Sequence, residues 1–448
     1  MSTERASVLW CEFAWLGGER AEAGVLIELD GERIDSVATD VARPPRTATV
    51  LPGLTIPGLA NTHSHAFQRA LRGRTQAGRG DFWTWRRQMY AIADSIDPDL
   101  YLALARATFA EMALAGITAV GEFHYVHHAS RGVRYSDPNA MGRALINAAR
   151  EAGIRITLLD TCYLRGGIGR EAEGVQLRFS DDSAGAWAAR VDGLDVGPGA
   201  RLGAAIHSVR AVDPEAAAAV AAFAAERSWP LHAHVSEQRV ENEDCASAYG
   251  RTPMAVLADA GALSERFTAV HATHLAEADF TLLGDGACGA CLCPTTERDL
   301  ADGVGPARRL ADADARLSLG TDSHALIDMF EEARAVELDE RLVSGLRGQH
   351  SAAQLLRAAT TGGCIGIGWP EAGEIASGRL ADLVTVSLDG VRLAGTSTDR
   401  AIESLVFAAT AADVRHVLVG GQFVVRDRTH LQLDVGAELD RAIAMLPA

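Results

Sequence analysis

Short β-rich runs alternate with longer helical patterns of hydrophobic positions from residue 54 onward. Apolar, β-branched runs bounded by Gly, Pro or Asp are typical of buried strands. The candidate strands are 54–65, 117–125, 155–163, 201–209, 231–236, 267–273, 287–294 and 316–324. Helical patterns between them, such as 99–116 and 139–153, end at a Gly, which is common where helices stop. Eight successive β-α units predict an α/β fold, a (β/α)8 barrel of the TIM type.

The two ends of the chain show a different pattern. Residues 7–50 and about 371–430 alternate with the two-residue period of strands, and Asp-Gly and Gly-Gly pairs indicate hairpin turns. We expect the two ends to pair into one small β-sandwich domain beside the barrel. The predicted division is 57–370 for the catalytic barrel, with 1–56 and 371–448 as the two parts of the β-sandwich.

Composition narrows the possible partners. The chain has 448 residues, 48% of them hydrophobic, and its 59 acidic and 42 basic residues give a formal net charge of −17. A chain of this length can bury a large core, and its acidic balance repels phosphate backbones and anionic lipid. We therefore expect a small-molecule partner and neither nucleic acid nor a membrane. The oligomeric state stays open, and a homodimer is compatible with the sequence.

Three further features concern the compartment and the available chemistry. The seven cysteines are odd in number, and Glu and Arg near the N-terminus interrupt any signal-like apolar run, so a reduced, cytoplasmic setting is predicted. The most apolar segment, 214–229, is too short to span a bilayer and reads as a soluble helix. No lysine occurs anywhere, which excludes a Schiff base and a carboxylated lysine that bridges two metals.

Histidines and one carboxylate gather at the predicted C-terminal ends of the barrel strands. Residues i and i+2 of a strand point to the same face, so His63 and His65 should converge on one point. The other candidates are His232 and His234 with the nearby Glu237, His271 and His274, and Asp322. Imidazole and carboxylate groups suit Zn²⁺ or Fe²⁺, and three or four such ligands leave a position for water, as in catalytic sites.

These residues, with 378-GRLADLVTV-386, make the chain resemble the amidohydrolase superfamily of metal-dependent barrels over nearly its whole length. A narrower resemblance is to the formimidoylglutamate deiminases of histidine degradation. Its motifs are 61-NTHSHAFQRALRG-73, 82-FWTWRRQMY-90, 121-GEFHYVHH-128, 207-HSVR-210, 234-HVSEQ-238, 270-VHATH-274 and 320-GTDSH-324.

The resemblance implies a zinc-dependent hydrolysis of N-formimidoyl-L-glutamate to N-formyl-L-glutamate and ammonia. It places one divalent metal per chain, zinc, on His63, His65, His234 and Asp322. Bound water would ionise near neutral pH, with Asp322, His271 and Glu237 as the catalytic residues that hold and move its protons. It assigns substrate binding to Gln68, Arg86, Tyr125, His207 and Arg210. The guanidinium groups among them match the two carboxylates of this substrate.

Two other functions remain open at this stage. The first is another deaminase of the same superfamily that acts on a guanine, cytosine or adenosine ring. The second is a non-catalytic metal-binding barrel. The buried charged cluster argues against it, because burying charge is costly and a protein without catalysis has no physical reason to keep it. The leaving group is also open on chemical grounds, because the tetrahedral intermediate could lose formamide in place of ammonia.

Several other residues are given structural roles. Cys288, Cys291 and Cys293 form a C-x-x-C-x-C pattern without a second cysteine pair nearby, and we expect them to pack in the core. His127 and His128 are expected in a solvated loop. His232 and His324 are expected to support the metal ligands without binding the metal.

Overall fold

The computed structural model describes residues 6–77, 79–80 and 82–447. Its central sheet has eight strands, and all neighbouring pairs are parallel, which confirms the predicted barrel. In spatial order the strands are β5 (Leu59–Ser64), β6 (Ile117–His124), β7 (Arg155–Cys162), β10 (Ala200–Ile206), β11 (Leu231–Val235), β12 (Phe267–His271), β13 (Gly289–Leu292) and β14 (Arg316–Leu319). The two longest, β6 and β7, are buried at every position, as expected for parallel strands covered on both faces.

The barrel closes between β5 and the segment that follows β14, a junction that we call the seam. A parallel bridge joins Ser64 to Asp322. The N–H of His65 donates to the carbonyl of Asp322 at 3.1 Å, and the N–H of Asp322 donates to the carbonyl of His63 at 3.0 Å. Gly320 lies directly against His63, where an added Cβ would be 2.8 Å from both the Cβ and the carbonyl oxygen of His63.

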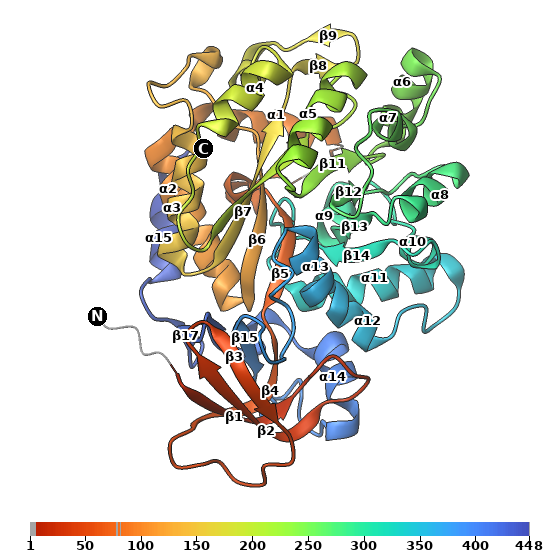
Figure 1. Ribbon diagram of the computed structural model, residues 1–448. Helices are drawn as coiled ribbons and strands as arrows, with labels where there is room; N and C mark the ends of the chain where they lie inside the picture. Colours follow the sequence, from red (N-terminus) through yellow and green to blue (C-terminus); the bar gives the residue numbers. More distant parts are fainter. Residues whose placement is uncertain (1–5, 78, 81, 448) are drawn as a thin grey trace.

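Helices surround the barrel (Figure 1). They are α2 (Pro98–Leu114), α3 (Ala140–Ala152), α4 (Ala184–Asp192), α5 (Pro214–Glu226), α6 (Arg239–Tyr249), α7 (Pro253–Asp259), α8 (Glu277–Asp285), α9 (Pro294–Asp299), α10 (Ala307–Asp312), α11 (Met329–Ser344), α12 (Ala352–Arg357) and α13 (Gly363–Gly366). The predicted helices at 99–116 and 139–153 correspond to α2 and α3, and Gly153 ends α3 in the left-handed conformation at φ 78°. None of the helices in the described ranges combines the length and apolarity needed to cross a membrane.

The loops above the strand ends carry further elements. They are α1 (Phe82–Ser95), β8 (Arg165–Gly167), β9 (Arg170–Glu171), and the short 3₁₀ helices η1 (Ala66–Leu71), η2 (Ser130–Gly132) and η3 (Gly174–Arg178). The β8–β9 hairpin and α1 lie at one end of the barrel, and the sheet formed by the two ends of the chain lies at the other (Figure 1).

The two ends of the chain pair in one mixed sheet, as predicted. Its order is β18 (Thr429–His430), β17 (Gln422–Arg426), β16 (Val414–Val419), β15 (Leu383–Val386), β4 (Thr49–Pro57), β1 (Val8–Ala14), β2 (Glu22–Asp30) and β3 (Arg33–Ala38). Ile34 of β3 and Phe423 of β17 belong to one apolar cluster although their strands lie at opposite sides of the sheet. The sheet therefore folds over its own core, and it lies below the barrel in Figure 1.

The predicted first barrel strand, 54–65, is two strands in the structure. Its first half belongs to β4 of the terminal sheet, and only β5 belongs to the barrel. Gly58 separates them and lies against the side chain of Thr118, whose Oγ1 would be 2.1 Å from an added Cβ. The continuous apolar pattern hides this change of sheet, because both halves are buried.

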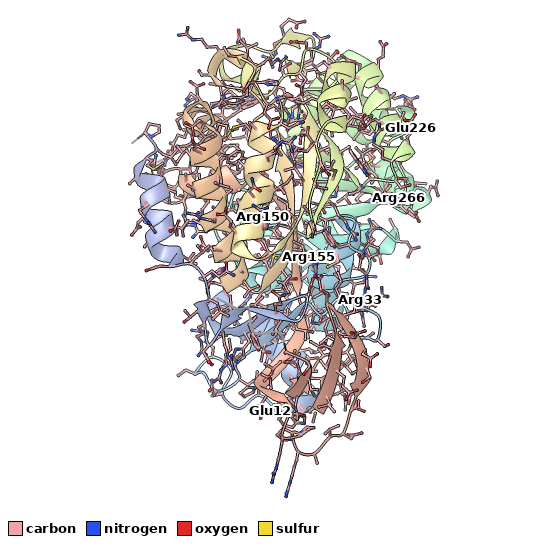
Figure 2. All side chains as sticks on the ribbon, turned by 60° about the vertical axis from the view of Figure 1, so that its left-hand side comes forward. Glu12, Arg33, Arg150, Arg155, Glu226 and Arg266 are labelled. Atoms are coloured by element: carbon pink, nitrogen blue, oxygen red, sulfur yellow. The ribbon has the colours of Figure 1, made fainter. Side chains whose placement is uncertain are left out.

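A buried ion pair joins the barrel to the terminal sheet. Arg155, the first residue of β7, donates from Nε and Nη2 to the two carboxylate oxygens of Asp382 at 2.7 and 3.0 Å. Figure 2 shows Arg155 low on the barrel, above the terminal sheet that contains Glu12. Asp382 is the aspartate of the GRLADLVTV motif, and this pair gives that motif a structural role.

The C-terminal part of the chain also contacts the barrel directly. Helix α15 (Val435–Ala444) packs against α2, and α14 (Ala401–Ala408) packs against α11 and α12. The small helices η4 (Ala358–Gly362), η5 (Thr398–Arg400) and η6 (Ala411–Asp413) complete the described elements. Segment 371–448 thus supplies strands to the terminal sheet and helices to the outer surface of the barrel.

We predict that Gly320→Ala destabilises the protein through the seam. Its Cβ would overlap the backbone of His63, and overpacking of this kind typically costs about 1–3 kcal/mol. Calorimetry should show a lower unfolding temperature. Gly185→Ala in α4 is the matched control, because the nearest atom to its added Cβ is the Ser183 hydroxyl at 3.9 Å. Equal unfolding temperatures for the two variants would contradict this role of Gly320.

Candidate active site

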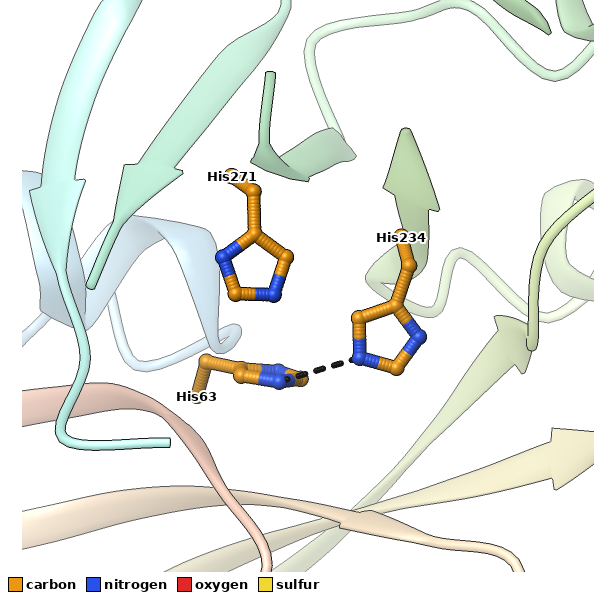
Figure 3. A group of neighbouring side chains, drawn as sticks. All are labelled: His63, His234 and His271. Atoms are coloured by element: carbon orange, nitrogen blue, oxygen red, sulfur yellow. Dashed lines mark hydrogen bonds between the residues drawn. The ribbon is translucent and has the colours of Figure 1, made fainter. Parts of the chain in front are cut away.

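The predicted metal ligands converge where the barrel strands end. His63 and His65 come from the end of β5, His234 from β11, and Asp322 from the segment after β14. Asp322 Oδ1 lies 3.3 Å from His63 Nε2 and 3.4 Å from His65 Nε2. His63 Nε2 lies 3.2 Å from His234 Nε2, the contact drawn as a dashed line in Figure 3. The nitrogen and oxygen atoms of all four residues therefore point to one centre.

The protonation of two of these rings follows from their outer partners. Nδ1 of His65 lies 3.0 Å from the carbonyl of Phe123, and Nδ1 of His234 lies 2.9 Å from the carbonyl of His207. A carbonyl only accepts, so each Nδ1 carries the proton and each Nε2 presents its lone pair to the centre. Burial lowers the pKa of His63, His65 and His234, which keeps the rings neutral. Neutral imidazoles and one carboxylate are a donor set that fits a divalent transition metal.

His271 is held beside this cluster by a carboxylate of its own. Its Nδ1 lies 3.3 Å from Glu297 Oε1, and its Nε2 lies 3.8 Å from Asp322 Oδ2. Burial lowers the pKa of His271, but the hydrogen bond to Glu297 and the nearby carboxylates outweigh burial and raise this pKa to about 10. Its ring is nearly parallel to that of His234, with an interplanar angle of 12° (Figure 3).

A second set of buried polar groups fixes the seam beneath the cluster. The hydroxyl of Ser64 donates to Glu122 Oε2 at 2.5 Å, and the N–H of Ala66 donates to Glu122 Oε1 at 2.7 Å. His324 lies 3.1 Å from the Ser64 hydroxyl and 2.8 Å from that of Thr321. These bonds hold the turn between His63 and His65, so the two rings keep their directions.

The backbone at the strand ends is strained. Asp322 has φ 44°, His324 has φ 57° and His271 has φ 66°, all in the left-handed region that residues with a Cβ seldom adopt. Such conformations cost of order 1–3 kcal/mol each and are typical of functional sites. Here they set the directions of side chains in two segments, the end of β12 and the loop after β14.

One cavity joins this cluster to every residue predicted to bind substrate. It is lined by His65, His234, Glu237, His271 and Asp322, and also by Gln68, Arg86, Tyr125, His207 and Arg210. Gln68 Nε2 donates to the Tyr125 hydroxyl at 3.2 Å, and the Arg86 guanidinium lies 4.3 Å from the ring centre of Trp83. His63 is fully buried behind the residues that line the cavity.

Arg210 is paired with a predicted catalytic residue. Its Nη2 donates to Glu237 Oε2 at 2.8 Å, and its Nε lies 3.8 Å from Glu241 Oε2. Burial lowers the pKa of Arg210, but the two carboxylates outweigh burial and raise it. The sequence motifs place Arg210 and Glu237 in one site without indicating that they contact each other.

The structure corrects the expectation that His127 and His128 are solvated. Both are buried, with 1% and 2% of their surface exposed. His127 Nε2 donates to the carbonyl of Thr161 at 2.9 Å, and His128 Nε2 lies 3.0 Å from Asp181. The loop after β6 is covered by η3, where the carbonyl of Arg178 accepts the N–H groups of His127 and His128 at 3.0 and 2.9 Å. The polar sequence of the loop gives no sign of that cover.

The remaining histidines and cysteines have supporting positions. His232 Nε2 donates to the carbonyl of Gly366 at 2.9 Å, below the cluster, and His274 Nε2 donates to the carbonyl of Asp302 at 2.8 Å. The three cysteines of the C-x-x-C-x-C pattern are buried free thiols, as expected for core packing, and they are Cys288, Cys291 and Cys293.

Sequence reasoning missed several residues of the site. Glu297 orients His271, Glu122 holds the turn after β5, and Glu241 lies beside Arg210. Tyr163 and the aromatic residues of α1 line the cavity. Glu241 lies in the first turn of α6, four residues after Glu237, and nothing in the sequence distinguishes it from an exposed acidic residue. Glu122 lies inside the motif 121-GEFHYVHH-128 without an assigned role, and Glu297 lies in a polar run beside Arg298 and Asp299.

Fold and site together define a barrel enzyme with a buried imidazole and carboxylate centre at its strand ends. The chain matches the Amidohydrolase family over residues 54–424, more than half of its length, and it belongs to that family. It is accordingly a hydrolase that acts on C–N bonds, of the amidohydrolase deaminase type.

Individual relatives cover most of the chain. Formimidoylglutamate deiminase from Pseudomonas aeruginosa is 37% identical over 85% of this chain and 86% of its own length. A 5-methylthioadenosine/S-adenosylhomocysteine deaminase from Natronomonas pharaonis is 29% identical over 93% of this chain and 91% of its own length. The crystal structure of an amidohydrolase from Brucella melitensis is 32% identical, with a TM-score of 0.90, and covers 98% of this chain and 100% of that one.

We predict a pH-dependent effect of Glu122→Gln in metal-free protein. Burial raises the pKa of Glu122 to about 8, so its carboxyl is protonated at pH 6 and resembles the Gln amide. The stability that a raised pKa contributes is complete below the unfolded value of about 4.3 and is lost as pH rises through about 8. Urea unfolding should therefore show wild type losing stability relative to the variant between about pH 5 and pH 9. A difference that stays constant over this range would contradict the protonated state.

Proposed function

We propose that the protein hydrolyses N-formimidoyl-L-glutamate to N-formyl-L-glutamate and ammonia. The observation that carries this proposal is the presence of two arginines, Arg86 and Arg210, in the same cavity as the histidine and aspartate cluster. An anionic protein that binds a dicarboxylate needs local positive charge, and guanidinium groups can bond a carboxylate through two parallel N–H groups. The similarity to the Pseudomonas deiminase supports the same substrate.

We propose that His63, His65, His234 and Asp322 hold one divalent metal ion, zinc. The support is the donor set: three buried imidazoles, two of them with Nε2 lone pairs fixed toward the centre, and one carboxylate. When bound, such an ion supplies a hydroxide nucleophile at neutral pH. The chain has no lysine to bridge a second ion, so one ion per chain is the proposed stoichiometry.

The remaining groups have proton-handling roles in this proposal. Asp322 accepts the proton of the attacking water, and His271 donates a hydrogen bond from Nε2 toward the same oxygen. Glu237, at the cavity wall, carries a proton to the departing nitrogen. The water oxygen bonds to the formimidoyl carbon, the bond from that carbon to the terminal nitrogen breaks, and ammonia leaves.

A second candidate function is deamination of a purine ring. The same cavity is lined by Phe82, Trp83, Tyr125 and Tyr163, whose rings suit a flat heterocycle. The Natronomonas relative is named for an adenosine-type substrate. The two arginines favour the dicarboxylate, because a neutral ring offers no carboxylate for a guanidinium to bind.

The first experiment is incubation of metal-loaded protein with N-formimidoyl-L-glutamate. We predict ammonia and N-formyl-L-glutamate in equal amounts, measured by an ammonia assay and by NMR. Adenosine, guanine and cytosine run in parallel should release no ammonia at comparable rates. Formamide and glutamate as products would show that ammonia is not the leaving group and would contradict the proposed reaction. Faster release of ammonia from a purine would favour the second candidate function.

We also predict about one zinc per chain by elemental analysis, with His234→Asn losing it. His232→Asn is the matched control, because His232 lies on the same strand but donates to the carbonyl of Gly366 and forms no hydrogen bond with the four proposed ligands in the described residues. It should keep the metal. Two tightly bound ions per active chain, or equal loss in both variants, would contradict the proposed ligand set.

A further inference from the structure

The Arg210 guanidinium lies between two carboxylates that differ in their freedom to move. It contacts Glu237 at 2.8 Å and Glu241 at 3.8 Å, and all three residues line the cavity. The side chain of Glu241 is fully buried, whereas those of Glu237 and Arg210 are 9% and 19% exposed. One positive charge is thus shared by two negative charges at the place where a negatively charged substrate is proposed to bind.

Glu241 is held in place by its own elements. It lies in the first turn of α6, and its Oε2 accepts the N–H of Glu237 at 3.2 Å. Glu237 instead lies in the short connection between β11 and α6, directly after Ser236 with φ 52°. Its carboxylate reaches the cavity, where it can turn from the guanidinium toward the cluster. The two carboxylates therefore have different roles: Glu241 stays beside Arg210, and Glu237 is able to leave it.

We propose that Arg210 exchanges partners when substrate binds. In the free protein Arg210 Nη2 donates a hydrogen bond to Glu237. A substrate carboxylate then replaces Glu237 as the acceptor of this bond, and Glu237 is released to carry protons. This rests on the proposed function, because it needs a substrate with a carboxylate. A third carboxylate cannot join the other two at one guanidinium without strong repulsion, so one of them must withdraw. An ion-paired carboxylate is also a poor proton acceptor, so release couples substrate recognition to catalysis.

The coupling makes Glu241 a positioning residue and Arg210 a specificity-determining residue. An amidine without carboxylates would leave Glu237 bound to Arg210 and would react slowly even when its reactive carbon reached the centre. The protein would thereby discriminate against such amidines in kcat as well as in KM.

Binding of glutarate to metal-loaded protein, measured by calorimetry, tests the exchange without turnover. Glu237→Gln replaces the charge-assisted bond that glutarate must displace with a weaker neutral one, so glutarate should bind about 5-fold tighter or more. Glu241→Gln is the matched control. It removes the same charge beside the same guanidinium, but from a side chain that is proposed to stay beside Arg210 when glutarate binds. Its affinity should change by less than about 2-fold. Arg210→Met should lose this binding, and metal content and unfolding temperature check that each variant is folded.

The outcomes separate this inference from the proposed function. Equal tightening in both glutamate variants would show that only the removed charge matters, and it would overturn the exchange. Absence of glutarate binding in every variant would overturn it as well. A crystal structure with glutarate should show Arg210 Nη2 and Glu237 Oε2 farther apart than about 3.5 Å, beyond hydrogen-bond distance. Release of ammonia from formimidoylglutamate, assayed on the same wild-type protein, decides the proposed function independently.

Discussion

Closure of the barrel at the seam is the constraint on which the site depends. The two backbone hydrogen bonds between β5 and the segment after β14 involve His63, His65 and Asp322 themselves. The bonds that complete the sheet therefore also set the spacing of three of the groups that face the centre. A side chain at Gly320 would separate the two segments, and the buried Asn61 and Thr321 bond to each other across the same seam at 2.7 and 2.9 Å.

Two buried arginines are paired with aspartates in small, well-defined groups. Arg190 donates to both Asp160 and Asp181 below the loop after β6, and Arg155 pairs with Asp382 at the base of the barrel. Removing one partner of such a pair is costly, because it leaves an uncompensated charge away from water. These pairs fix the barrel relative to its covering elements. The histidine and aspartate centre differs, because its lone pairs face one another and a cation is the partner that they fit.

The cavity differs in charge from the chain as a whole. The chain carries a formal net charge of −17, which opposes the approach of a dianion. Four arginines line the cavity, Arg86, Arg165, Arg170 and Arg210, and they offset its four carboxylates, Glu237, Glu241, Asp244 and Asp322. The arginines come from α1, the β8–β9 hairpin and the segment after β10, so they are supplied by loops that follow three different barrel strands. Loops of this kind can change the ligand of a barrel without changing the centre.

The sequence by itself determined the barrel, the pairing of the two ends and the residues that gather at the strand ends. These follow from periodicity and from the rule that parallel strands present their C-terminal ends at one face, which needs no knowledge of side-chain contacts. The resemblance to a known family, which short motifs such as His-Ser-Val-Arg carry, added the cavity residues.

Only the tertiary structure decided which of these groups touch. The split between β4 and β5, the burial of His127 and His128, and the pairing of Arg210 with Glu237 all depend on segments distant in sequence. A hydrophobic pattern reports that a segment is buried but not which sheet buries it, and a polar loop gives no sign of the helix above it. Hydrogen bonds and ion pairs are set by angstrom-scale distances between loops, and those distances exist only once the barrel has closed.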